Sequence, residues 1–261
     1  MRRLKRTILL VGLAIPLTGA FVSFNVGTAL AESTSSTLLS VDLLSVDSAS
    51  LAPEEKLAKA KEDLLRALDL SLKKVESLKN RLNELNFPED SREQALKNEA
   101  LDDLNTYAEY YLNAKENLDK KGSLDEVKDL AKEIKEYRDT TYTPGVEKTI
   151  RFILVFYNEE VLGVANDRFS KIGADIKKLD KLGVVKEGDF QEKLNEVTNL
   201  LKEAADLQGE AKKIILATST DPGKSEEPSA KDMIEKSLNN VKTVYGIFLE
   251  LNQLVKEALG I

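Results

Sequence analysis

The chain has 261 residues, of which 38 are Lys or Arg and 45 are Asp or Glu, and it contains no Cys, His or Trp. The lack of His and Cys excludes zinc sites built from these ligands, Ser-His and Cys-His nucleophile pairs, a haem held by an axial His, and disulfides. With 42% apolar and 32% charged residues but only 13 Gly and 6 Pro, the composition is typical of long helices.

Residues 1–31 have the three parts of a secretory signal peptide. Four basic residues lie before Thr7, an apolar stretch covers residues 7–24, and the small residues Ala29 and Ala31 precede Glu32. We therefore expect cleavage after Ala31, with Glu32 as the new N-terminus, and export to the periplasm, the cell surface or the medium. If the leader is retained, its apolar stretch of about 18 residues becomes a membrane anchor instead.

Removal of the leader makes the chain more acidic. The remaining part carries 34 basic and 45 acidic residues, a net charge of −11. Nucleic acids bind clustered Lys and Arg, and anionic lipid surfaces attract basic segments. The charge therefore argues against nucleic acid as a partner and against simple electrostatic docking to a membrane.

Residues 32–52 have the composition of a linker. Ser and Thr fill nine of the nineteen positions from Glu32 to Ser50. Such a segment buries too little apolar surface to fold alone, so we interpret it as a flexible tether. The alternative is that its Leu and Val residues add a short strand to a partner.

From residue 53 onward, apolar residues recur at helical spacing. Pro53 followed by Glu54 and Glu55 is a typical helix start, and the Leu residues that follow form a heptad stripe. No segment shows the alternation of a strand. The expected helices are residues 53–86, 91–120, 123 to a break at 140–145, 146–182, 189–218 and 230–259, with a loop at 218–229.

Three local patterns add detail to these helices. Ser123 and Glu126 predict a capping box at the third start. Thr140 to Gly145, which includes Pro144, predicts the clearest break in the chain. Residues 152–157 are apolar on all sides and predict the centre of the core.

Together these patterns predict an all-α protein. We expect an elongated up-and-down bundle of about five to six long helices with coiled-coil-like packing. The expected organisation is a signal peptide at 1–31, a linker at 32–52 and the bundle at 53–261.

No motif indicates catalysis. Glu159 and Glu160 are neighbours on a helix and point about 100° apart, so they cannot face one substrate atom together. Ser71 and Lys74 have S-x-x-K spacing, but the S-D-N and K-T-G segments that accompany it in penicillin-recognising enzymes are missing. Calcium loops, P-loops and dinucleotide fingerprints are also missing. We predict no catalytic residue, no metal site and no cofactor.

Two features favour interactions between macromolecules or helices. Tyr107, Tyr110 and Tyr111 crowd one helical turn and spread beyond a single face, so at least one ring is expected at the surface as a contact residue. The alternative is that all three pack against the next helix. Polar residues also interrupt the apolar stripes, and we interpret them as fixing helix register. These residues are Lys61, Ser71 and Gln208.

Three functional hypotheses follow. The first is an exported, non-enzymatic bundle of the cell envelope or extracellular space that acts as a spacer or binds another macromolecule, either a protein or an envelope component. The second is a membrane-active or lipid-binding bundle, similar to a toxin. The third is an enzyme that uses carboxylates, Tyr or Lys alone. The apolar stripes would also allow the chain to pair with itself as a homo-oligomer.

Overall fold

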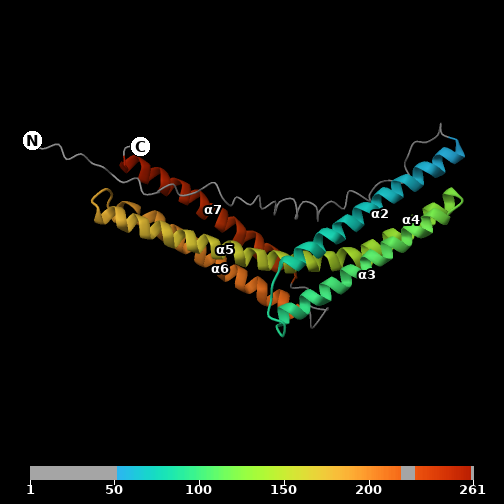
Figure 1. The fold of residues 1–261 in the computed structure, drawn as a ribbon, viewed down its shortest axis with the longest axis horizontal. Coiled ribbons are helices and arrows are strands. Elements are labelled where there is room, and N and C mark those ends of the chain that lie inside the picture. Colours follow the sequence, from blue (N-terminus) through green and yellow to red (C-terminus); the bar gives the residue numbers. More distant parts are fainter. Residues whose placement is uncertain (1–51, 219–226, 260–261) are drawn as a thin grey trace, which may run out of the picture. The chain divides into compact units, whose positions relative to one another are not determined.

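The computed structural model describes residues 52–218 and 227–259, and the regular elements in this part are all helical (Figure 1). The expected leader, its cleavage site at Ala29, Ala31 and Glu32, and almost all of the expected linker lie outside the described residues. The elements are α2 (Pro53–Glu84), α3 (Arg92–Lys120), α4 (Leu124–Tyr137), the π-helical turn η2 (Arg138–Tyr142), α5 (Thr143–Lys181), the 3-10 turn η3 (Glu187–Phe190), α6 (Gln191–Thr218) and α7 (Glu227–Leu259).

The prediction of an all-α chain with up-and-down neighbours is confirmed. Helix α4, turn η2 and helix α5 follow one another without a break, so the described part contains five continuous helical segments. Helix α2 packs against α3 and α4, whereas α5 packs against α6 and α7. Helix α5 also contacts α2 and α3, which joins the two groups.

The helix starts follow from local chemistry. The Ser91 hydroxyl accepts a hydrogen bond from the Gln94 amide at 3.1 Å, and α3 begins at the next residue. The predicted capping box is confirmed, because the Ser123 hydroxyl accepts from the Glu126 amide and the Glu126 carboxylate accepts from the Ser123 amide. These bonds satisfy amide groups that have no partner within their own helix.

The predicted break at residues 140–145 is wrong. Tyr137 and Thr143 both have right-handed helical backbone angles, and the Thr143 amide donates to the carbonyl of Arg138, five residues back. A proline inside a helix removes a hydrogen bond and clashes with the preceding turn, but a wide turn is one way in which a helix continues past such a disturbance. The helix therefore passes Pro144 and does not end there.

The predicted centre of the core is confirmed. The five side chains from Phe152 to Phe156 are all buried, while Tyr157 is half-buried. Phe87, in the segment between α2 and α3, packs edge-on against Phe156 with ring centroids 4.7 Å apart and against Phe152 at 6.0 Å. The apolar run at residues 152–156 is therefore the point where the two helix groups meet.

A buried polar network lies beside this core. The Asn158 amide group donates to the Ser237 hydroxyl at 3.0 Å, and that hydroxyl donates to the Ala204 carbonyl at 2.8 Å. The Gln208 amide group reaches the Val155 carbonyl at 3.4 Å. These bonds can form only when α5, α6 and α7 are aligned along their axes as they are here. This agrees with the interpretation of Gln208 as a residue that fixes helix register.

In residues 52–218 and 227–259, none of the helices combines the length and the apolar character needed to cross a membrane.

Candidate functional site

Five of the seven tyrosines of the chain meet where α3 passes the segment that contains η2. Tyr107, Tyr110 and Tyr111 come from α3, Tyr137 ends α4, and Tyr142 ends η2. We call these five residues the tyrosine cluster. It includes all three residues that the sequence singled out as a contact surface.

The members of the tyrosine cluster differ in exposure. Tyr107, Tyr111 and Tyr142 are only 6%, 0% and 5% exposed, so they belong to the interior. Tyr110 and Tyr137 are half-buried. The partly exposed members of the cluster are therefore Tyr110 and Tyr137.

The five rings hold one another in place. Tyr110 and Tyr137 stack with centroids 3.5 Å apart and an angle of 14° between their planes. Tyr142 meets Tyr111 and Tyr107 edge-on at 5.2 and 5.5 Å. All three α3 tyrosines contact Tyr137. The alternative prediction was that all three α3 tyrosines pack against the next helix. They do contact Tyr137 of that helix, and Tyr110 is nevertheless partly exposed.

Sequence reasoning missed Tyr142, because it assigned this residue to a break. A signal was present in the spacing of the apolar stripe. Ile134 and Tyr142 are both buried and eight residues apart, one more than the seven of two α-helical turns. A spacing between buried positions that is one residue longer than two α-helical turns indicates a wide turn inside the helix.

The cluster is neutral at physiological pH. Burial, more than any neighbour, raises the pKa of Tyr107, Tyr110, Tyr111, Tyr137 and Tyr142, and for Tyr137 the pKa reaches about 12. Negative neighbours act in the same direction on Tyr107 through Asp103 and on Tyr110 through Glu133. The hydroxyls are therefore suited to hydrogen bonding and contact rather than to nucleophilic attack.

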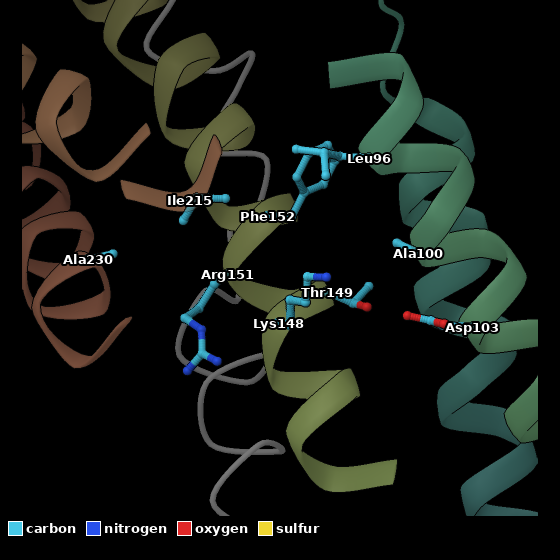
Figure 2. Close-up of a pocket in the computed structure, with 9 residues that line it drawn as sticks. All are labelled: Leu96, Ala100, Asp103, Lys148, Thr149, Arg151, Phe152, Ile215 and Ala230. Carbon is cyan, nitrogen blue, oxygen red and sulfur yellow. The ribbon is translucent and has the colours of Figure 1, made fainter. Parts of the chain in front are cut away.

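A small cavity lies near the cluster, between α3, α5 and the adjoining ends of α6 and α7 (Figure 2). Its volume is about 30 Å³, which is close to the space one water molecule occupies in the liquid. Burial raises the pKa of Asp103 in its wall, and nearby Lys148 opposes this effect. A drug-sized ligand needs about ten times this volume or more. The lining residues are Leu96, Ala100, Asp103, Lys148, Thr149, Arg151, Phe152, Ile215 and Ala230.

The other polar residues noted in the sequence have structural partners. The Glu159 carboxylate accepts from Lys212 at 2.9 Å, and this lysine also lies 4.9 Å from the centre of the Phe156 ring. Glu160 is exposed. The Ser71 hydroxyl donates to the Ala67 carbonyl one turn back. The part of the chain that the structure describes holds no group of three or more acidic residues placed to bind a metal ion.

Comparison with known proteins gives no relative to argue from. No family model matches the chain, and neither the curated proteins nor the solved structures that were searched include a match. The function is therefore argued from the residues alone.

Proposed function

We propose that this protein is an exported, non-enzymatic helical bundle of the cell envelope or the extracellular space, which binds another macromolecule or acts as a spacer. In this proposal the bundle is elongated, has coiled-coil-like packing, and follows a cleaved leader and a Ser-rich linker. Tyr110 and Tyr137 form its contact surface, and Tyr107 and Tyr111 support them.

The observation that carries the proposal is the stacked pair Tyr110 and Tyr137. Both residues are half-buried and stack on each other, so they combine partial exposure with a fixed place in the cluster. The Tyr110 hydroxyl also reaches the Glu133 carbonyl at 3.4 Å. Rigid aromatic side chains with a polar tip are enriched in protein interfaces, because they bury a large area at a small loss of conformational entropy.

Cell fractionation tests the export half of the proposal. We expect a soluble species in the periplasm or the medium, with a mass and N-terminal sequence that begin at Glu32. A membrane-bound species of full mass would replace the cleaved leader with an anchor. An unprocessed species in the cytoplasm would overturn export altogether.

Photo-crosslinking tests the contact half. A benzophenone amino acid replaces Tyr110 in one variant and Leu112 in a matched control, because Leu112 lies on the same helix and is 52% exposed. Two residues along an α-helix turn the side chain by about 200°, so the two probes face different surroundings. After irradiation in the cells that make the protein, we expect an adduct with a protein or an envelope polymer from position 110 alone.

The other outcomes of this experiment are equally informative. Equal adducts from both positions, or none from position 110, would contradict a contact surface at the tyrosine cluster. Adducts with lipid from position 110 would favour the membrane-active hypothesis over the proposed one.

A further inference from the structure

The turn η2 is the only π-helical segment in residues 52–218 and 227–259. Its backbone bond runs from the Thr143 amide to the Arg138 carbonyl, and the next residue, Pro144, has no amide hydrogen to donate. One turn later the Thr149 hydroxyl donates to the Gly145 carbonyl, a bond that often bends helices. The regular backbone hydrogen-bond pattern is therefore disturbed between α4 and α5.

The wide turn η2 keeps the apolar stripe in phase across one extra residue. The buried positions are Val127, Leu130 and Ile134 before the turn and Tyr142 and Val146 after it. If one residue of the turn were removed, Ile134 and Tyr142 would be seven apart, the spacing of two turns of an ordinary α-helix. With the residue present, a plain α-helix would turn Tyr142 about 80° away from the face of Ile134, so the wide turn takes up the extra residue and keeps Tyr142 on the buried side.

Tyr142 is the buried residue of the turn. Asp139, Thr140 and Thr141 are exposed, as are Thr143 and Pro144 after them, whereas Tyr142 is 5% exposed. The Tyr142 hydroxyl is buried and accepts or donates no hydrogen bond within the described residues. A buried hydroxyl without a partner is unfavourable, and contact with water would satisfy it.

We propose that η2 is a hinge that gates the tyrosine cluster. The segment opens at Arg138–Tyr142, Tyr142 leaves its place against Tyr107 and Tyr111, and these two rings become accessible. The purpose of this opening rests on the proposed function, since it enlarges the aromatic surface offered to a partner. The hinge itself is a property of the free chain, so its test does not require the partner.

Hydrogen exchange of the purified full chain tests the hinge. We expect the amides of residues 139–143, 145 and 146 to exchange at least about tenfold faster than those of residues 130–134 and 150–156, because local opening at the turn exposes them first. Protection of the turn equal to that of its neighbours would overturn the proposal.

Two variants link the exchange to the turn. Pro144→Ala restores an amide donor, and the same substitution combined with deletion of Thr141 converts the segment into a plain α-helix. We expect both to slow exchange at 139–146 by about tenfold and to reduce quenching of tyrosine fluorescence by acrylamide. Tyrosine is a clean reporter here because the chain has no Trp and five of its seven tyrosines are in the cluster.

Pro88→Ala is the matched control, because it changes an exposed proline between α2 and α3 and should leave exchange at 139–146 unchanged. If the deletion variant fails to fold, Pro144→Ala alone still decides the outcome. Unchanged exchange and unchanged quenching in Pro144→Ala would overturn the hinge, whatever the crosslinking experiment finds about the contact surface.

Discussion

At the scale of the residue, Gly145 shows how closely the backbone of α5 approaches the tyrosine cluster. A Cβ atom at this position would lie 1.8 Å from the Tyr107 hydroxyl oxygen and 2.8 Å from the ring carbon that carries it. Tyr107 is 6% exposed, so its ring has little room to move aside. We expect Gly145→Ala to lower the free energy of unfolding by about 1–3 kcal/mol, measured by urea denaturation.

Gly163 provides the matched control in the same helix. A Cβ atom there meets nothing within 4 Å, and the residue is exposed. Gly163→Ala should therefore stabilise the protein by about 0.5–1 kcal/mol, the usual gain when Ala replaces Gly inside a helix. Adding Tyr107→Phe to Gly145→Ala should restore part of the loss, because the hydroxyl is the closest atom. Equal effects of the two glycine substitutions would contradict the steric account.

Ser237 is the second residue whose effect follows from its contacts. Its hydroxyl joins the Asn158 amide group to the Ala204 carbonyl, and all of its side chain is buried. Ser237→Ala leaves both partners without this hydroxyl in a place that water does not reach. We expect a loss of about 1–3 kcal/mol in the free energy of unfolding, measured by the shift of the urea midpoint.

Thr243→Ala serves as the control for this substitution. The Thr243 hydroxyl also donates to a carbonyl, that of Asn239 at 3.1 Å, but the residue is exposed. Water can replace that bond, so the change should stay within about 0.5 kcal/mol. A similar small effect of Ser237→Ala would show that the buried network does not contribute to stability.

At the scale of the element, the helices and their starts could be predicted because they depend on nearby residues. The starts at Ser91 and Ser123 and the end of α2 before Phe87 were visible in the sequence. The path through Pro144 was not, because Pro and Gly carry the same local signal whether a helix stops or widens. Only the eight-residue step from Ile134 to Tyr142 separates the two cases.

The tyrosines that join α3 to the η2 segment make the fold sensitive to alkaline pH. The pKa of Tyr137 is about 12 in the folded protein, raised chiefly by burial, against about 10 for an unfolded chain. The folded state therefore keeps a proton that the unfolded state loses above about pH 10. We expect the free energy of unfolding contributed by this group to be fully present below about pH 10 and to fall as the pH rises toward about 12.

Urea denaturation between about pH 8 and pH 11, with tyrosinate absorbance of the folded protein, measures this dependence. Tyr137→Phe is the control, since it keeps the ring and removes both the ionisable group and a buried hydroxyl that has no partner among the described residues. This variant should be at least as stable near neutral pH and lose less stability in alkali. The same pH dependence in both proteins would contradict the assignment to Tyr137.

At the scale of the whole described chain, α5 belongs to both helix groups. It packs against α6 and α7 and also contacts α2 and α3. Its Phe152 and Phe156 rings contact the ring of Phe87, which lies between α2 and α3 in the sequence. Because one helix is shared, we expect the two groups to unfold together. Tyrosine fluorescence, which reports mainly on the cluster, and far-ultraviolet circular dichroism, which reports on all helices, should give coincident urea transitions.

Phe87→Ala tests this coupling. Loss of the ring removes the contacts with Phe152 and Phe156 without changing a helix, so the two transitions should separate, with a loss of a few kcal/mol at most from a half-buried site. Leu112→Ala is the control, because Leu112 is 52% exposed and should leave the transitions coincident. Coincident transitions in Phe87→Ala would show that other contacts couple the groups.

The sequence alone determined the all-α class, the capping box at Ser123, the apolar run 152–157 as the centre of the core, of which 152–156 are buried, and the exclusion of chemistry that needs His or Cys. These properties depend on composition and on the 3.6-residue period, which are local. Only the tertiary structure decided that the helix passes Pro144, that Tyr142 joins the tyrosine cluster, and which of its rings lie at the surface. The reason is that each depends on α3, whose side chains reach η2 from positions about 30 residues earlier in the chain.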